Sequence, residues 1–457
     1  MMDTKKIIHE KIRQILFLTI TIILSQDLFA GEGQLYVGWA GADITPDRPV
    51  ALVGQLHKRI SEAVQDPLTA TVLALETREQ DGSSEQAIMI SCDILFVRAQ
   101  TQKKLQDAIA LKLTDFDPSK LFINALHSHT SPGFIDDEYY GLYDTSNDKG
   151  VMKPSEYEIF FLERVTDAVV RAWEGRKPGG YSWGLGNALL GHNRRTVKTD
   201  GSAKMYGVGD PDFLHYESID DEMVQMLFFF DIDNNLTGMV VNSVATAQVT
   251  DNTNFISADF YSEARENFRK KFGKDVFVLF QIGAAGDITP ASHEYIYRRA
   301  MKAMLERKGI SARQELADRM LQAVEDVFLY SKTGISERTV FRHLVAKINL
   351  PSMGPANLPF YMVDSVTPAE LHIIRLGDIA IATNPFELFS DYGLLMKSGS
   401  KAILTFIVQL ACHHSGYLPT ERAVKGGGYS ADKYFVGPEG GYKLVDETVR
   451  LINALWE

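Results

Sequence analysis

The stretch LFINALHSHTSPGF (residues 121–134) joins an apolar run to two histidines and a turn. The run from 121 to 126 predicts a buried β-strand. On an extended backbone, residues i and i+2 point to the same face, so His127 and His129 can converge on one point. Open α/β sheets bind ligands at the carboxyl ends of their strands, and neutral imidazole is a common zinc ligand. A metal-binding pair and an ordinary strand-to-loop corner both remain open at this point.

Further apolar, β-rich runs of similar length occur along the chain. They cover residues 69–76, 86–96, 224–232, 238–246, 275–283 and 379–385. Several are nearly continuous in hydrophobic residues, which is typical of strands buried on both faces. Amphipathic stretches typical of helices lie between them, at residues 101–113, 158–175 and 258–273. This alternation predicts an α/β protein, a layered fold in which helices cover a mixed, largely buried β-sheet.

The chain has the organisation of one globular domain. Of its 457 residues, 45% are hydrophobic and 23% are charged, and this length is enough to bury a large core. No Pro/Ser-rich linker or low-complexity tract interrupts residues 33–457, which we therefore expect to form a single domain. The net charge of −12, without a long Lys/Arg block, argues against a nucleic-acid partner.

The N-terminus carries the pattern of a secretory signal. Its basic side chains are Lys5, Lys6, Lys11 and Arg13. They precede the apolar run ILFLTITIIL (15–24), and Ala30 ends the QDLFA that follows. This pattern predicts a signal peptide over residues 1–30 and a secreted or periplasmic protein. The apolar run is shorter than the roughly 20 residues that span a membrane, and a retained N-terminal anchor is the alternative.

The chain has two cysteines, Cys92 and Cys412. Two cysteines so far apart in the sequence do not form a disulfide framework. We interpret both as buried thiols that pack as small hydrophobic side chains. We therefore expect no zinc site built on cysteine.

The segment HSHTSPG (127–133) resembles the HTHSGPGG segment of the neutral ceramidase family, the non-lysosomal amidases that cleave N-acylsphingosine. Further segments resemble family segments in the same order along the chain. They are GADITP (41–46), QDPLTATVLALE (65–76), SCDILF (91–96), GHNRR (191–195), IDDEMVQMLFFFD (219–231), ISADFYSEAR (256–265), GAAGDITP (283–290), NPFELFSDYG (384–393) and SGYLPTERAVKGGGY (415–429). The resemblance covers roughly residues 35–455. It implies the catalytic domain of the family, without the extra C-terminal β-sandwich domain of longer members.

The family holds its zinc with two histidines, a glutamate and a tyrosine. By motif, His127 is similar to the first histidine ligand, Glu387 in NPFEL to the glutamate and Tyr417 in SGYLPT to the tyrosine. Imidazole, carboxylate and a phenolate-like oxygen together would make a Lewis-acidic site. Ordinary alternatives exist, since Glu387 follows Pro385 and could begin a helix, and Tyr417 could be a packing aromatic.

Four further residues resemble groups that surround the scissile amide in the family. His129 is similar to a histidine near the substrate carbonyl, and Arg194 and Tyr429 to donors that stabilise the developing oxyanion. Thr289 in GDITP stands where the family has a serine implicated in catalysis, and its hydroxyl could attack or position the nucleophile. The alternatives are a structural ion pair for Arg194, a packing ring for Tyr429 and a turn residue for Thr289.

One position departs from the family pattern. The second histidine ligand is expected in a strand-end segment, where this chain reads NSVATAQVT (242–250) and has Ala247. Alanine carries no donor atom, so the zinc site is incomplete by motif. The neighbouring Gln248, or a histidine from elsewhere, would have to take this place. The candidate histidines are His192, His413 and His414.

The resemblance implies an exported amide hydrolase that cleaves an N-acyl, ceramide-like linkage with the help of Zn²⁺. Its partner would be a lipid-like or other N-acyl amide substrate, and peripheral contact with a membrane would follow from such a substrate. The alternative, which Ala247 supports, is a degenerate member of the family that binds a lipid or glycan without hydrolysing it. The sequence leaves the oligomeric state open.

Overall fold

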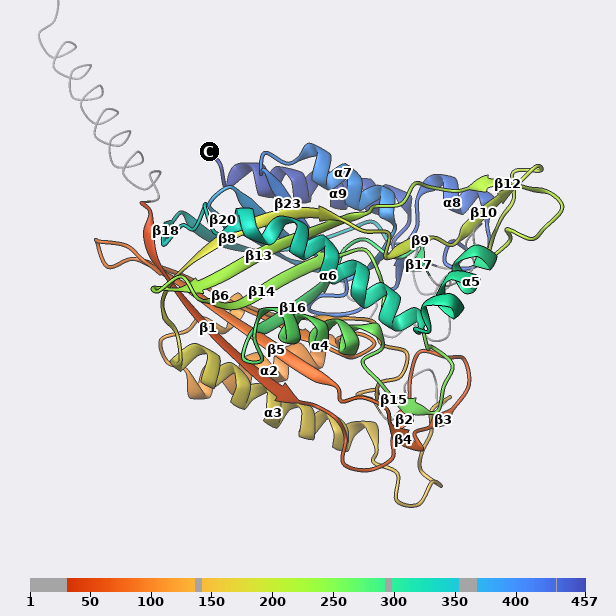
Figure 1. Cartoon of the computed structure of the whole chain (residues 1–457), viewed down its shortest axis with the longest axis horizontal. Coiled ribbons are helices and arrows are strands. Elements are labelled where there is room, and N and C mark those ends of the chain that lie inside the picture. Colours follow the sequence, from red (N-terminus) through yellow and green to blue (C-terminus); the bar gives the residue numbers. More distant parts are fainter. Residues whose placement is uncertain (1–30, 136–141, 292–297, 353–367, 433) are drawn as a thin grey trace, which may run out of the picture.

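The computed structural model describes residues 31–135, 142–291, 298–352, 368–432 and 434–457. The predicted signal peptide, residues 1–30, lies outside the described residues. The described chain folds into four layers, with two β-sheets in the middle and helices on both outer faces (Figure 1).

The larger sheet contains nine strands. Their bounds are β1 (Gly33–Asp43), β5 (Thr69–Arg78), β6 (Ser84–Cys92), β7 (Leu121–Ala125), β8 (Lys177–Asn187), β13 (Met223–Asp231), β14 (Leu236–Ser243), β16 (Phe277–Ile282) and β18 (Arg338–Thr339). The spatial order is β16-β14-β13-β8-β1-β5-β6-β7, with β18 paired to β1. The pairs β14–β16 and β6–β7 are parallel and the others are antiparallel, so the sheet is mixed.

The smaller sheet packs face to face against the larger one. It contains β19 (Phe341–Ile348), β20 (Ala369–Leu376), β21 (Ile379–Thr383) and β23 (Leu404–Val408), in that order. Between the sheets, Leu73 and Phe229 of the larger sheet share one apolar cluster with Ile374 and Phe406 of the smaller sheet. Successive side chains of a strand point to opposite faces, so Val72, next to Leu73, packs towards the helices instead.

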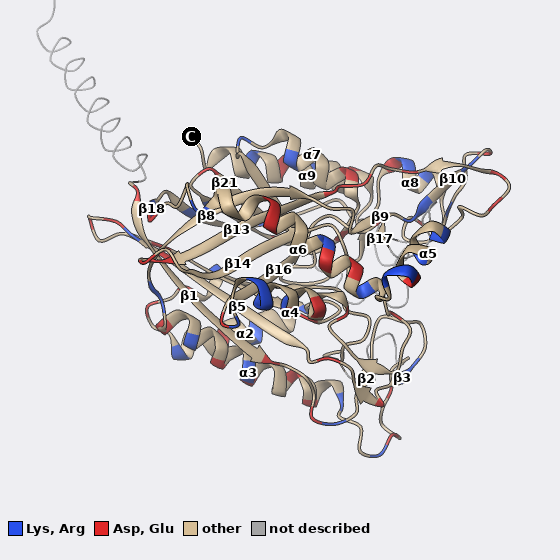
Figure 2. Ribbon diagram, in the orientation of Figure 1, with Lys and Arg blue, Asp and Glu red and all other residues tan. Residues whose placement is uncertain are grey.

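Helices cover the outer face of each sheet (Figure 1). The larger sheet carries α2 (Ala99–Lys112), α3 (Pro154–Glu174), α4 (Phe260–Phe272) and α6 (Ala312–Ser331). The smaller sheet carries α7 (Ser390–Gly399) and α9 (Pro438–Ala454). Other described helices are η1 (Pro118–Lys120), α5 (Arg298–Lys308) and α8 (Glu421–Gly426). Figure 2 shows charged residues mainly on helices and loops, whereas the central strands are mostly uncharged.

Short strands form small sheets, most of them at the end of the molecule that lies at the right of Figure 1. They are β2 (Ala51–Leu52), β3 (Arg59–Ile60), β4 (Ala63–Val64), β9 (Gly191–Asn193), β10 (Arg195–Lys198), β11 (Ala203–Met205), β12 (Phe213–Tyr216), β15 (Phe255–Ile256), β17 (Ile288–Pro290), β22 (Glu387–Leu388) and β24 (Tyr417–Leu418). Their pairing holds together the loops that carry the candidate site residues.

The structure confirms the predicted fold class, a layered α/β fold with a mixed, largely buried sheet covered by helices. The seven strands expected from the sequence appear as β5, β6, β7, β13, β14, β16 and β21, and the three helices as α2, α3 and α4. The sequence did not reveal that the strands divide into two facing sheets. It also missed β8 (KPGGYSWGLGN), because glycines interrupt its apolar pattern. None of the described helices is long and apolar enough to cross a membrane.

Candidate active site

A cavity of about 270 Å³ collects the residues that the sequence singled out. Its walls include segments that follow the carboxyl ends of β6, β7 and β14 in the larger sheet and of β21 and β23 in the smaller sheet. Six of the seven candidate residues line it: His127, His129, Arg194, Glu387, Tyr417 and Tyr429. The two sheets therefore meet at this cavity, and each contributes side chains that can do chemistry.

His127 stands two residues beyond the end of β7 with a backbone φ of 60°, a conformation that few residues other than glycine adopt. Its Nδ1 lies 3.0 Å from the carbonyl oxygen of Leu95. A carbonyl only accepts hydrogen bonds, so Nδ1 carries a hydrogen, and in the neutral form of the ring Nε2 carries the lone pair. This Nε2 lies 3.4 Å from Oε2 of Glu387.

Glu387 comes from the second sheet, in the short strand β22, which pairs in parallel with β24 so that Glu387 lies opposite Tyr417. Its other carboxyl oxygen, Oε1, lies 3.1 Å from Nε2 of His414. Burial acts to raise the pKa of Glu387, but His127 and His414 outweigh it and hold this pKa well below its ordinary value. The side chain is therefore a carboxylate between two imidazoles.

His129 contacts Gln248, the neighbour of Ala247 in the sequence. Its Nε2 lies 2.8 Å from Nε2 of Gln248 and 3.4 Å from Nε2 of His127. Burial and the neighbouring His127 lower the pKa of His129 well below its ordinary value, so the ring is neutral at physiological pH. Gly54, with φ +101°, allows this close packing, because a Cβ there would lie 2.6 Å from Cγ of His129.

Ala247 and Gln248 are placed differently by the structure. Ala247 is 1% exposed and belongs to the apolar cluster that includes Phe260 and Tyr261. Gln248 lines the cavity instead, with its amide nitrogen on His129. Of the three candidate histidines, His414 lines the cavity, whereas His192 and His413 are not among the residues that line it. Of the candidates for the place of the missing histidine, Gln248 and His414 are thus the two that line the cavity.

Arg194 and two tyrosines form the opposite part of the cavity. The guanidinium group donates to the carbonyl of Gly286 at 2.8 Å and to the hydroxyl of Tyr417 at 3.2 Å. It lies 5.8 Å from the ring centres of both Tyr417 and Tyr429. Burial, together with Glu387 and Tyr429, raises the pKa of Tyr417 well above its ordinary value. In this structure its oxygen is therefore a neutral phenol, whereas the resemblance implied a phenolate-like ligand.

Thr289 does not line the cavity, and the side chain of Tyr206 connects it to the cavity. It sits in β17 opposite His192 of β9 and is 2% exposed. Its hydroxyl lies 3.1 Å from the hydroxyl of Tyr206, which does line the cavity. The structure therefore connects Thr289 to the cavity through Tyr206, a residue that the sequence gave no reason to select.

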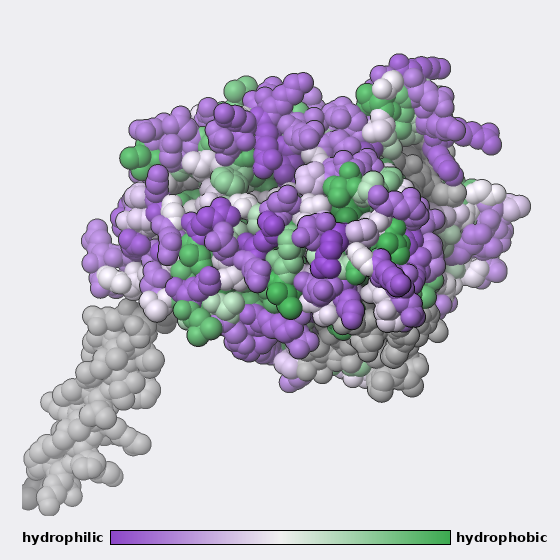
Figure 3. Space-filling model, turned by 90° about the horizontal axis from the view of Figure 1, so that it is seen from below, coloured by the Kyte–Doolittle hydropathy of each residue, from purple (hydrophilic) through white to green (hydrophobic). Residues whose placement is uncertain are grey.

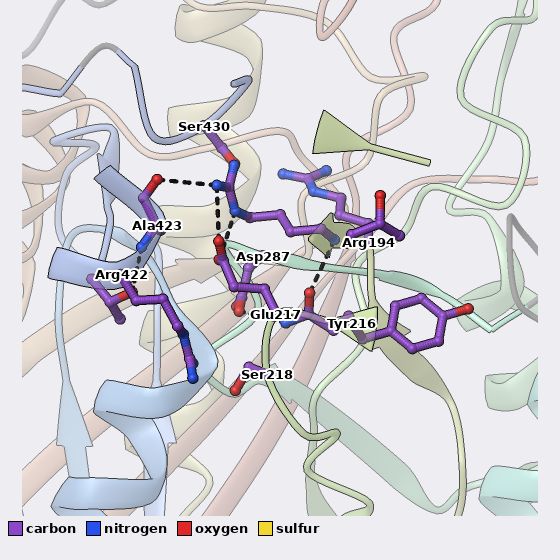
Figure 4. A network of polar contacts seen from close by, with 12 residues as sticks. Arg194, Tyr216, Glu217, Ser218, Asp287, Arg422, Ala423 and Ser430 are labelled. Carbon is purple, nitrogen blue, oxygen red and sulfur yellow. Dashed lines mark hydrogen bonds and ion pairs between the residues drawn. The ribbon is translucent and has the colours of Figure 1, made fainter. Parts of the chain in front are cut away.

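Arg195, the second arginine of the HNRR segment, anchors the loop that carries Tyr429. Its buried guanidinium forms a two-point ion pair with Glu217, at 2.7 and 3.1 Å. Close to Glu217, the same group donates to the carbonyl of Ala423 at 3.2 Å (Figure 4). It also donates to the carbonyls of Gly427 and Tyr429, both at 2.8 Å. The sequence did not predict this role for Arg195. Its position next to Arg194 was the only feature of the sequence that could have indicated it.

Asp287 is a buried carboxyl group that connects the segment before Arg194 to Ser390. Its carboxyl group accepts hydrogen bonds from the backbone N–H of Ser390 at 2.7 Å, from the Ser390 hydroxyl at 3.0 Å and from the side-chain amide of Asn193 at 2.7 Å. Complete burial raises its pKa to about 6. Asp287 thereby ties β9, which precedes Arg194, to the start of α7.

Comparisons with known proteins agree with this picture at the level of the fold. No family model matches the chain, and no curated protein matches it. Among solved structures, neutral ceramidase from Pseudomonas aeruginosa aligns with a TM-score of 0.68 over 93% of this chain and 74% of that chain. The fold is ceramidase-like. A ceramidase complexed with C2 aligns similarly, with a TM-score of 0.66 over 93% of this chain and 75% of that chain.

Sequence identity to both structures is 15%, so the likeness concerns the fold. It agrees with the resemblance drawn from short segments of the sequence, which a search for whole-family similarity did not detect. The assignment of individual catalytic roles depends on the geometry of the cavity itself.

Replacing Arg195 with Met should strongly destabilise the protein, because Glu217 would be left as a buried charge without its partner. We expect the free energy of unfolding to fall by about 3–5 kcal/mol. Arg422→Met is the matched control, since Arg422 pairs with Asp391 while 53% exposed, and such a pair contributes about 0–1 kcal/mol. Urea denaturation measures both variants, and equal effects in the two would contradict the anchoring role of Arg195.

Proposed function

We propose that this chain hydrolyses the amide bond of N-acyl, ceramide-like substrates, with zinc held by His127, Glu387 and Tyr417. The observation that carries the proposal is the facing pair of His127 Nε2 and Glu387 Oε2, 3.4 Å apart, in a cavity that also contains Arg194. The ceramidase-like fold supports the same reading.

The chemistry of this pair fits a bound cation. In a neutral ring with its hydrogen on Nδ1, His127 would turn a lone pair towards the carboxylate of Glu387, and a cation between these two acceptors would satisfy both. Their separation of 3.4 Å is longer than the roughly 2.7–2.9 Å of a hydrogen bond between an imidazolium and a carboxylate. It is close to the roughly 3.3 Å that separates two ligand atoms of a tetrahedral zinc ion. Tyr417, opposite Glu387 in the strand pairing, would supply an oxygen, and Gln248 or His414 stands near the remaining side.

Zinc, when bound, supplies Lewis acidity for the substrate carbonyl and for an attacking water. The protein's own groups then stabilise and relay charge. Arg194 lines the cavity, so its guanidinium group would donate to a developing oxyanion. As the water oxygen bonds to the carbonyl carbon, the neutral His129 would accept a proton at Nε2 and pass it to the leaving amine nitrogen when the C–N bond breaks.

The remaining lining is compatible with an acyl chain. Leu56, Leu95, Phe96 and Met205 are apolar side chains of the cavity wall, and Leu56 is 55% exposed. Phe96 stacks on the His414 ring with centres 4.4 Å apart. A long apolar chain can therefore leave the cavity along Leu56, while the amide remains near Arg194 and His129.

We also propose export, which the basic and apolar pattern of residues 1–30 supports. A lipid-like substrate would be met at a membrane surface. On the face seen in Figure 3, however, hydrophobic side chains of the described residues form separate groups among hydrophilic ones. We propose that membrane contact involves the mouth of the cavity near the exposed Leu56.

Hydrolysis of a fluorescent short-chain ceramide tests the proposal. The zinc-supplemented protein should release fatty acid, and chelation should abolish the reaction. Arg194→Met should lower kcat by about 10²–10³-fold with a smaller effect on KM, because the oxyanion donor acts mainly in the transition state. Arg422→Met, on the exposed end of α8, should retain the full rate.

Binding of the ceramide without any release of fatty acid would instead support the non-catalytic alternative. A wild-type rate in Arg194→Met would contradict the role given to this arginine. Other N-acyl amides, measured in parallel, would define which substrate class the cavity accepts.

We expect that a histidine at position 248, rather than at position 247, would supply the missing zinc ligand. Gln248→His brings an imidazole to the cavity and should raise the affinity for zinc. Ala247→His forces a ring into an apolar cluster and should cost about 1–3 kcal/mol of stability without improving zinc binding. Zinc titration and urea denaturation of the two variants measure these effects. Tighter zinc binding by Ala247→His than by Gln248→His would show that Ala247 is the ligand position.

A further inference from the structure

A second cluster of metal-type donors lies outside the cavity, in the layer between the two sheets. It consists of Glu370, His372 and Cys412, whose ligand atoms all lie within 4.8 Å of one another. Glu370 and His372 are two residues apart in β20, so both side chains point to the same face of the strand, the face between the sheets. Cys412 belongs to the segment that follows β23 and is part of the apolar cluster between the sheets. In the part of the chain that the structure describes, no other three His, Cys, Asp or Glu side chains bring their ligand atoms this close together.

A chain of hydrogen bonds fixes which nitrogen of His372 faces the cluster. Nδ1 of His343 lies 2.9 Å from the carbonyl oxygen of Gln86, so this nitrogen carries a hydrogen. Nε2 of the neutral His343 is then an acceptor, and it lies 2.9 Å from Nδ1 of His372. His372 must therefore donate from Nδ1. Burial lowers the pKa of His372 and favours the neutral ring, in which Nε2 carries a lone pair. This arrangement resembles the outer hydrogen bonds that orient histidine ligands of metals.

The lone pair of His372 points at further acceptors. Its Nε2 lies 3.4 Å from Oε1 of Glu370, with the Cys412 sulfur also in reach. A hydrogen bond between charged groups would be shorter, at roughly 2.7–2.9 Å. The observed spacing is close to the roughly 3.3 Å between nitrogen and oxygen ligands of a tetrahedral zinc ion. We propose that Glu370, His372 and Cys412 bind a divalent transition-metal ion of the zinc class.

The donor types select this class of ion. A thiolate and an imidazole favour zinc and similar transition metals over calcium and magnesium, which prefer oxygen ligands only. His372 is 0% exposed and Cys412 1% exposed, whereas the Glu370 side chain is 18% exposed and gives the ion a route from solvent. On binding, the Cys412 thiol loses its proton to solvent, and its sulfur forms the bond to the metal.

The cluster is linked to the cavity by one short segment. Cys412 is followed by His414 and Tyr417, both of which line the cavity. The segment is held on β7, where the backbone N–H of Cys412 donates to the carbonyl of Ile123 at 2.9 Å. An ion bound at Cys412 would fix the start of this segment and would act as a structural site. Cys412 is then more than the packing thiol expected from the sequence.

Substitution with cobalt tests this inference, because a thiolate bound to Co²⁺ gives a charge-transfer absorption band in the near ultraviolet. The proposed active-site ligands include no sulfur, so the band reports on the second cluster. Wild-type protein loaded with Co²⁺ should show the band. Cys412→Ser should lose it, whereas Cys92→Ser, which removes the other cysteine of the chain, should keep it.

Absence of the band in the folded wild-type protein, or its persistence in Cys412→Ser, would overturn the inference. The wild-type spectrum decides even if Cys412→Ser does not fold, and His372→Gln should then weaken Co²⁺ binding while both thiols remain. The result is independent of the proposed function: a protein that shows the band but releases no fatty acid would retain this site and lose the hydrolase assignment.

Discussion

The site depends on the way in which the Gln409 side chain joins the two sheets. Its carbonyl oxygen accepts hydrogen bonds from the backbone N–H groups of Ala285 at 2.9 Å and Leu388 at 3.1 Å. Its own backbone N–H donates to the carbonyl of Ile282 at 3.0 Å. One buried amide thus connects the end of β16, in the larger sheet, with the strand that carries Glu387. If the sheets moved apart, the buried carbonyl oxygen of Gln409 would lose these hydrogen bonds, so the connection restricts how the sheets approach each other.

The contact made by Gln409 holds the carboxyl ends of β16 and β23 together, and the cavity forms at this end of the two sheets. His127 and His129 follow β7 of the larger sheet, whereas Glu387 and Tyr417 follow strands of the smaller sheet. Neither sheet alone provides both His127 and Glu387. The backbone of His127, with φ 60°, is in a sparsely populated conformation, as expected where a fold fixes functional side chains.

The amino-acid sequence predicted the long buried strands well, because runs such as 121–126 have the same hydrophobic signal whether one sheet or two are present. It did not reveal the second sheet, since pairing of β20 with β21 and β23 depends on contacts between segments with no local signal. Motif resemblance selected six residues that line one cavity. The sequence could not show that Gln248, and not Ala247, faces the cavity, because a one-residue difference at a strand end depends on local backbone geometry.

The residues that the sequence missed share a physical feature. Arg195 and Gln409 are buried polar side chains that contact distant backbone groups, and Glu217 is the buried ion-pair partner of Arg195. Composition and periodicity do not report such contacts. They position Tyr429 and Glu387 without touching the cavity's centre, so they become visible only once the fold is known.

The central claim is that the two sheets together hold one hydrolytic zinc ion. The most direct measurement is the anomalous scattering of a zinc-loaded crystal, recorded at the zinc absorption edge. The account predicts a peak within bonding distance of both His127 and Glu387. A crystal of active, zinc-loaded protein without a peak between these two residues would contradict it.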